Sequence, residues 1–186
     1  MKVQEKNLKN IMNEASLEKV SVEKASEDLF DFAIDRSDIK LILQSLPENK
    51  KINRVSVEYE IQLLKILAVG WSISFFLDES SLRKELSESF WNALHSFSQQ
   101  ISGISSSSTG KEIDYFNILK ERSDTYLKVL NLYTDGSDPL AVIGPTFAEI
   151  CGNEQDAHII FLGSKVFNLS VGGVKKYLES VQIEPQ

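Results

Sequence analysis

The most apolar stretch of the chain, ILAVGWSISFFL at 66–77, lies near its middle. In helical projection the polar residues of this region fall in one narrow sector, and apolar side chains cover most of the remaining surface. These polar residues are Glu58, Gln62, Lys65 and Ser72. The gap between Glu60 and Asp78 is shorter than the roughly 20 apolar residues of a membrane span. The pattern therefore predicts a buried central helix near residues 57–77 and no membrane span.

Shorter amphipathic segments flank this central helix. Ser21 is expected to cap a first helix, with a bend near Ser37 and Asp38 and a stop at Pro47. Apolar residues then recur at three- and four-residue spacing over 82–101 and again over 113–133, which predicts two long helices. Because a glycine inside a helix costs about 1 kcal/mol relative to alanine, Gly70 predicts that a neighbouring helix crosses closely at that point.

The last third of the chain is harder to assign from its pattern. A short helix after Pro139 is expected to be interrupted at Gly144-Pro145, and Gly172-Gly173 is expected to break the chain before a last helix. Residues 154–171 fit either a helix or a hairpin, and the helix is favoured. The fold class predicted is all-α, an irregular bundle of about six to eight helices around the 57–77 helix.

The domain organisation predicted is one helical domain over residues 1–186. Residues 1–19 form a weakly amphipathic N-terminal segment that is expected to dock loosely. The serine-rich tract at 102–110 is expected to be a flexible loop within the domain.

Charge and cysteine content narrow the expected partners and compartment. The chain has 20 Lys and Arg against 27 Asp and Glu, and this net charge of -7 argues against a nucleic-acid partner. Cys151 is the only cysteine, so an intrachain disulfide is excluded and a reduced cytoplasmic location is expected. The polar start of the chain lacks the apolar core of a secretory signal.

Several motif-like features do not meet the requirements of the chemistry they suggest. GISSSSTGK has six residues between its glycines where a phosphate-binding loop needs four. His95 and His158 lie in no zinc or di-iron pattern, and Cys151 is better explained as a small apolar residue than as a partner of His158. No metal, cofactor or catalytic residue is predicted.

Four aspartates follow the 3, 4, 3 spacing of one helix face: Asp28, Asp31, Asp35 and Asp38. If the first helix continues far enough, they form an acidic ridge opposite the core. A solvated face is the ordinary interpretation of such a ridge. The alternative is a docking site for a basic partner, which the ridge would steer and select.

Arg122 lies on the apolar side of its predicted helix, between Tyr115 and Tyr126. An unpaired buried guanidinium is costly, so it needs a carboxylate from another helix, backbone carbonyls, a bound anion or a cleft. A structural ion pair is favoured. The alternative makes Arg122, Tyr126 and Tyr115 a binding site for a ligand or partner.

Two functions are consistent with these patterns. The first is a non-enzymatic protein-interaction or regulatory module, which binds a protein partner or self-associates through exposed Trp91 and Phe161. The second is a site between helices for an anionic or amphipathic small molecule near Arg122, either in a binding protein or in an enzyme. Its apolar walls would be Trp71, Phe75 and Phe76.

Overall fold

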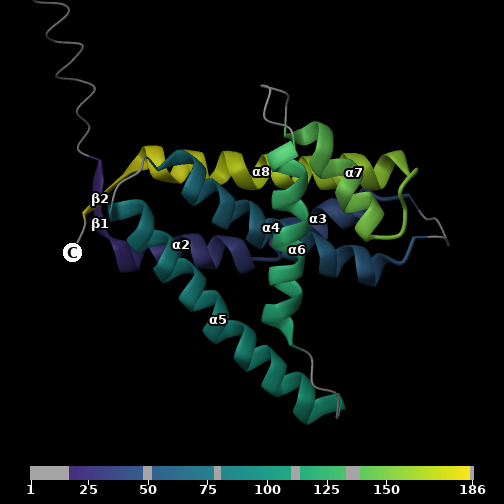
Figure 1. Ribbon diagram of the computed structural model, residues 1–186, viewed down its shortest axis with the longest axis horizontal. Helices are drawn as coiled ribbons and strands as arrows, with labels where there is room; N and C mark the ends of the chain where they lie inside the picture. The colour runs from purple at the N-terminus through teal and green to yellow at the C-terminus, as the bar shows by residue number, and fades with distance from the viewer. Residues whose placement is uncertain (1–16, 48–51, 78–80, 110–113, 133–138, 185–186) are drawn as a thin grey trace, which may run out of the picture.

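The computed structural model describes residues 17–47, 52–77, 81–109, 114–132 and 139–184. Figure 1 shows its arrangement, in which helices make up nearly all of the regular structure and the all-α prediction is confirmed. The elements in chain order are β1 (Glu18–Ser21), α2 (Val22–Ile34), α3 (Ser37–Gln44), α4 (Arg54–Phe76), α5 (Ser81–Thr109), α6 (Tyr115–Leu132), α7 (Leu140–Ile150), α8 (Ala157–Ser180) and β2 (Val181–Glu184).

Helix α4 forms the centre of the molecule, as the sequence predicted. It contacts each of the other described helices, and its apolar residues from Ile61 to Ile73 are almost fully buried apart from Trp71, which is half-buried. Two details differ from the expectation. Lys65 and Ser72, which belong to the predicted polar sector, are buried, and Phe75 near the C-terminal end is 63% exposed. The apolar surface of α4 is therefore covered over most, but not all, of its length.

Side-chain caps fix the beginnings of three helices. Ser21 accepts a hydrogen bond from the Lys24 amide at 3.2 Å, which confirms it as the N-cap of α2. Asn53 caps α4 and Asp156 caps α8 through bonds of the same kind. Between α2 and α3 the chain turns at residues 35–36, close to the predicted bend.

Two predicted breaks are wrong, because helices continue through both of them. α7 runs through Gly144 and Pro145, and α8 runs through Gly172 and Gly173. Close packing explains two of these glycines. A Cβ at Gly144 would lie 2.6 Å from the Ile160 carbonyl of α8, and one at Gly173 would lie 2.6 Å from the Phe32 ring. Tertiary contacts thus outweigh the low helix propensity of glycine.

Of the predictions for two further segments, one is confirmed and the other is wrong. Helix α8 covers most of 154–171, so the helix prediction for this range is confirmed over the hairpin. The tract at 102–110 was predicted to be a loop, but α5 continues to Thr109, and Gly110 lies outside the described residues. Serine lowers helix propensity only modestly, so an existing helix can extend through it.

A two-stranded parallel sheet, which the sequence analysis did not predict, joins the two ends of the described chain (Figure 1). β1 pairs with β2 in the register Glu18 to Val181 through Ser21 to Glu184, and the Lys19 ammonium lies 2.6 Å from the Glu184 carboxylate. Most of the N-terminal segment predicted over 1–19 lies outside the described residues. Its last residues contribute to this strand.

One described helix, α8, is long and apolar enough to cross a membrane if judged by length and composition alone. A core helix of a water-soluble protein passes the same test, so this is weak evidence for a span. In this structure α8 packs closely against α4 and α7.

Candidate functional site

Arg122 forms an ion pair with a carboxylate from the central helix. Its Nε donates to Glu60 Oε2 at 2.9 Å and its Nη2 donates to Glu60 Oε1 at 2.8 Å, which is the two-pronged geometry that guanidinium and carboxylate favour. Glu60 is buried on α4, and its hydrogen bonds to Arg122 raise the pKa of that arginine. Of the partners considered for Arg122, the structure therefore shows the carboxylate.

The sequence analysis did not identify Glu60 as this partner. Glu60 lies two residues after Glu58, which places it about 200° around the helix on the otherwise apolar side of α4. A charged residue on an otherwise apolar helix side is the same signal that singled out Arg122. Pairing the two required the docking of α6 on α4, which no local pattern contains.

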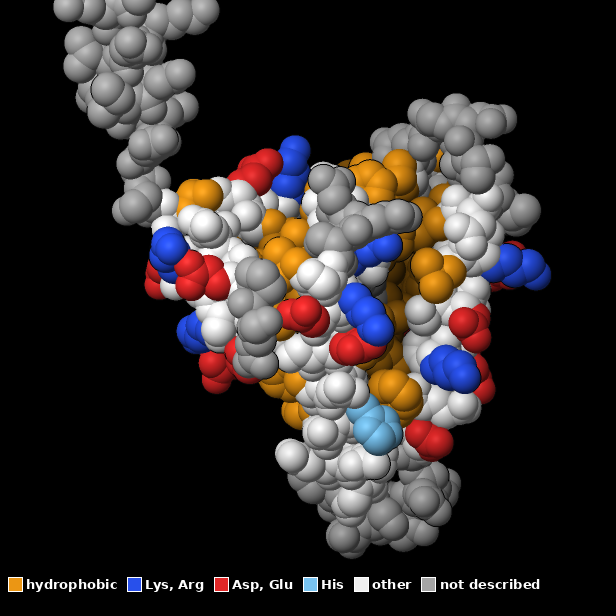
Figure 2. All heavy atoms as spheres, turned by 60° about the vertical axis from the view of Figure 1, so that its left-hand side comes forward, with side chains coloured by type: hydrophobic (Ala, Val, Ile, Leu, Met, Phe, Trp, Pro, Cys, Tyr) orange, Lys and Arg blue, Asp and Glu red, His pale blue; other side chains and the backbone are white. Residues whose placement is uncertain are grey.

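Hollows remain beside this ion pair where α5 and α6 pack on α4. Figure 2 shows a furrow on one face of the molecule, with hydrophobic side chains at its bottom and charged side chains along both sides. Two apolar cavities lie between the helices, and they share no lining residue. We name them the aromatic cavity and the tyrosine cavity.

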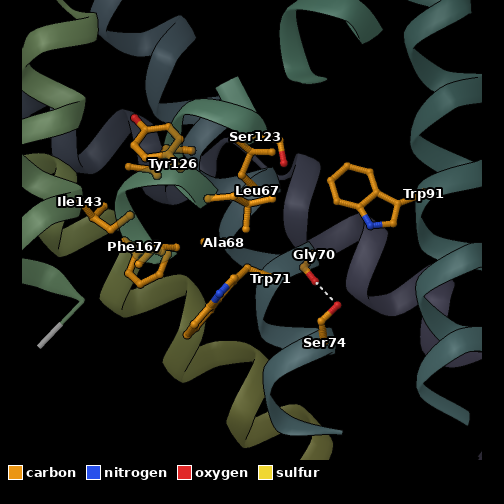
Figure 3. Close-up of a pocket in the computed structure, with 13 residues that line it drawn as sticks. Leu67, Ala68, Gly70, Trp71, Ser74, Trp91, Ser123, Tyr126, Ile143 and Phe167 are labelled. Carbon is orange, nitrogen blue, oxygen red and sulfur yellow. Dashed lines mark hydrogen bonds between the residues drawn. The ribbon is translucent and has the colours of Figure 1, made fainter. Parts of the chain in front are cut away.

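The aromatic cavity has a volume of about 320 Å³ and collects side chains from five helices (Figure 3). Its lining comprises Leu64, Leu67, Ala68, Gly70, Trp71, Ser74, Trp91, Ser123, Tyr126, Leu127, Leu130, Ile143 and Phe167. None of these side chains carries a charge. Pockets of about 300–1,000 Å³ with mostly apolar walls and a few polar groups are typical small-molecule sites.

Packing holds the two indoles of this cavity in place. Trp71 stacks on Phe75 with ring centroids 4.6 Å apart and tilts against Phe167 at 5.5 Å. Trp91 lies over Gly70, where a Cβ would come within 2.5 Å of its ring. The glycine was predicted to mark a closely crossing helix, whereas the group that approaches it is the indole side chain of Trp91 from α5.

This position corrects the prediction for Trp91. The helix phase of α5 predicted an exposed anchor, whereas the ring is half-buried and packs against the core. Gly70 has no side chain and makes the room for it. Phe161 is 67% exposed, as predicted. Of the walls expected around a ligand, Trp71 lines the aromatic cavity, whereas Phe75 and Phe76 are absent from its lining.

Tyr126 contributes its ring to the aromatic cavity. Figure 3 shows the hydroxyl directed away from the Trp91 side of the cavity. The hydroxyl oxygen is buried and has no hydrogen-bond partner among the described residues, and burial raises the pKa of Tyr126. Tyr126 therefore acts on the cavity mainly through its apolar ring.

Tyr115 lies in the tyrosine cavity, which has a volume of about 540 Å³. The cavity is lined by Ile34, Arg36, Val55, Glu58, Tyr59, Gln62, Ile66, Phe97, Ile101, Tyr115 and Ile118. Tyr59 and Tyr115 meet edge to face with ring centroids 6.1 Å apart, and Arg36 forms an ion pair with Glu58. The three predicted site residues are therefore distributed over two cavities and the ion pair between α4 and α6.

The four aspartates do not share one helix, because α2 ends at Ile34. Asp28 accepts from Tyr177 at 2.9 Å and pairs with Lys24 at 2.8 Å, while Asp35 accepts from the Ser37 amide and hydroxyl. The Asp38 carboxylate accepts from the buried Lys65 ammonium. Asp31 is exposed on α2. Three of the four carboxylates thus have contacts within the chain, and docking of a basic partner stays a prediction.

The remaining titratable candidates lie apart from the cavities. Burial raises the pKa of the Cys151 thiol to about 12, so the thiol stays protonated at neutral pH. The His158 imidazole lies 3.4 Å from the Asp156 carboxylate, and the His95 ring packs edge-on against Phe116. Within the described ranges, no group of three or more His, Cys, Asp or Glu is placed to hold a metal ion.

The arrangement can enclose apolar molecules, and it keeps the charges of Arg122 and Glu60 neutralised between the helices. Comparison with known proteins adds no assignment, since no family model, no curated protein and no solved structure matches this chain.

Proposed function

We propose that this chain is a binding protein that takes up an uncharged, apolar small molecule with a planar ring in the aromatic cavity. The observation that supports this most directly is the lining itself, in which two indoles, a phenol ring and a phenyl ring surround about 320 Å³ without a charged side chain. Planar rings gain additional stacking energy against such walls. The Ser123 hydroxyl supplies a polar group that can fix the orientation of the ligand.

This proposal departs from the anionic ligand considered for Arg122. The buried Glu60 carboxylate already pairs with that guanidinium through Nε and Nη2, so an anion at these two nitrogens would displace Glu60 and leave a buried carboxylate unpaired. An uncharged ligand avoids that cost. Binding rather than catalysis is favoured because Tyr126 is the one titratable side chain in the lining, and the pKa of its hydroxyl is raised.

The tryptophans provide the test, because the chain contains two and both line the cavity. We expect the neutral fluorescent probe N-phenyl-1-naphthylamine to bind saturably, to quench tryptophan emission by energy transfer and to raise the melting temperature. Ser123→Leu should fill part of the cavity and weaken probe binding at least tenfold. Thr125→Leu, on the exposed side of the same helix, is the matched control and should bind like the unchanged protein.

Two results would contradict the proposal. One is probe binding that does not saturate. The other is a folded Ser123→Leu protein with unchanged affinity, which would place the probe elsewhere.

A second candidate, the interaction module, is supported by one exposed side chain. Phe161 on α8 is 67% exposed beside a hollow of about 360 Å³ lined by Ser45, Leu46 and Lys165 among others. Aromatic side chains next to apolar hollows are frequent anchors in protein interfaces. Light scattering after size-exclusion chromatography should show a dimer that Phe161→Ser converts to a monomer, and a monomeric unchanged protein would argue against self-association.

A further inference from the structure

The tyrosine cavity offers a different chemistry from the aromatic cavity. Its inner wall is apolar, with Ile66 fully buried and Phe97, Ile101 and Ile118 packed around the space. The same cavity is also lined by charged and hydroxyl-bearing side chains, namely Arg36, Glu58, Tyr59 and Tyr115. An apolar volume with a polar group at one side fits an amphipathic molecule rather than a uniformly apolar one.

The polar groups of this cavity are mainly hydrogen-bond donors. A guanidinium has five N–H donors, and the contact of Arg36 with Glu58 is made through Nη2. Tyr59 and Tyr115 each add one O–H donor, and their rings meet edge to face. Burial raises the pKa of Tyr115 to about 12, so its hydroxyl is protonated at neutral pH and can donate a hydrogen bond. The positive charge of Arg36 is close enough to oppose part of this rise in the pKa.

The acceptors of this cavity are fewer than its donors. Glu58 is paired with Arg36 through Oε1, and its side chain is 29% exposed, so it can be hydrated when it leaves the arginine. The Gln62 amide nitrogen donates to the Ala33 carbonyl at 2.7 Å, which fixes the amide orientation. Its oxygen is buried without a hydrogen-bond partner among the described residues and has no accessible surface for a ligand. Donors in excess of free acceptors favour a ligand whose head group accepts hydrogen bonds.

We propose that the tyrosine cavity binds a monocarboxylate with an apolar chain. The chain lies against Phe97, Ile101 and Ile118, and the carboxylate takes the place of Glu58 on the Arg36 guanidinium while the tyrosine hydroxyls donate to it. Arg36 is suited to this exchange because its side chain is 55% exposed, so the pair with Glu58 is held only weakly in water. The proposal does not depend on a ligand in the aromatic cavity.

The test uses ligands that share one chain and differ in the head group. Decanoate, decanol and decyltrimethylammonium are titrated into the protein by calorimetry. The two ions are kept below the concentrations at which they form micelles, and decanol is kept below its solubility limit. Decanoate should bind at least tenfold more tightly than the other two. Octanoate, which is two methylenes shorter, should bind about fifteenfold more weakly than decanoate, since each buried methylene contributes about fourfold.

Three substitutions give the sharper outcome. Arg36→Gln should weaken decanoate at least tenfold and leave decanol within twofold. Glu58→Gln should strengthen decanoate severalfold, because it removes the competing carboxylate. Lys40→Gln removes the same charge from an exposed position on α3 and should change neither ligand. Melting curves confirm that each variant is folded.

Opposite effects of Arg36→Gln and Glu58→Gln would support the proposal. Equal affinity for the three head groups, or equal weakening by both substitutions, would overturn it. Decanoate affinity should also survive Ser123→Leu, which fills the aromatic cavity. A loss in that variant would place decanoate in the aromatic cavity and refute this assignment.

Discussion

Lys65 shows how a single charged residue is accommodated in the core. Its side chain is 2% exposed, and its ammonium donates to the Asp35 carbonyl at 2.8 Å and to both oxygens of the Asp38 carboxylate at 3.0 and 3.1 Å. The ammonium also lies 4.8 Å from the centre of the Phe32 ring. The residue therefore ties α4 to the corner between α2 and α3.

The two partners of this contact should respond unequally to mutation. Asp38→Ala leaves a buried ammonium without its carboxylate and should cost about 2 kcal/mol, which is below the roughly 3–5 kcal/mol of a fully buried pair because Asp38 is partly exposed. Lys65→Met removes the charge and keeps the apolar stem, so it should cost less. Urea unfolding of both variants measures the difference. A larger loss for Lys65→Met would contradict this account.

Tyr126 and Tyr177 form a second contrast, because one hydroxyl is unpaired and the other is not. Tyr126→Phe removes a buried hydroxyl without a partner, so the free energy of unfolding should stay constant or rise by about 1 kcal/mol. Tyr177→Phe removes a donor to Asp28 at 2.9 Å and should lower it by about 1 kcal/mol. Thermal unfolding followed by circular dichroism distinguishes the two. A clear loss in Tyr126→Phe would reveal a partner for that hydroxyl.

At the scale of single helices, local propensity and packing can disagree, and packing decides. Gly144 and Gly172 both lie inside helices, where glycine is disfavoured. Only Gly144 has close neighbours, the Ser164 hydroxyl and the Ile160 carbonyl, while a Cβ at Gly172 would meet nothing within 4 Å. Glycine is thus required at the first position and tolerated at the second.

Alanine substitution at these two positions should therefore have opposite effects. Gly172→Ala should stabilise the protein by about 1 kcal/mol through helix propensity alone. Gly144→Ala should destabilise it by about 2 kcal/mol, because a backbone atom cannot move aside without shifting α7 against α8. The midpoints of urea unfolding, compared at equal slope, report both changes. Similar effects at the two positions would mean that the close approach of α7 and α8 is not maintained in solution.

For the whole molecule, the features that could be predicted from the sequence are those that depend on the spacing of residues within one helix. The burial of Ile61 to Ile73 and the cap at Ser21 follow from spacing and local hydrogen bonding, and both are confirmed. The unusual position of Arg122 could also be recognised. Its partner Glu60 is 62 residues away, so their contact depends on how two helices dock.

The cavities were beyond sequence analysis for a related reason. A cavity is the space that several helices leave between their side chains, and the aromatic cavity draws on α4, α5, α6, α7 and α8. The same applies to the sheet. β1 and β2 are four residues each and pair across almost the whole chain, so neither carries a hydrophobic alternation long enough to be recognised.

The raised pKa values of buried acids predict a loss of stability in alkali. The pKa of Cys151 is about 12 in the folded chain, whereas an ordinary thiol titrates near 9. Since the folded pKa is raised, the unfolded chain releases its proton first, and the free energy of unfolding falls as the pH rises from about 9 to 12. Urea unfolding at pH 8, 9, 10 and 11 should show this decline. The Cys151→Ser variant should show a shallower decline, and an identical one would assign the effect to other groups.

The parallel register of β1 and β2 has a mechanical consequence. The chain enters the pair at Glu18, opposite Val181, and leaves it at Glu184, opposite Ser21. A force that pulls Glu18 and Glu184 apart therefore acts at opposite ends of the ribbon and slides one strand along the other. In that shear geometry the backbone hydrogen bonds bear the load together, whereas strands pulled from the same end would unzip bond by bond. When the molecule is pulled at Glu18 and Glu184, the β1–β2 pair must therefore break before the force acts on the helices.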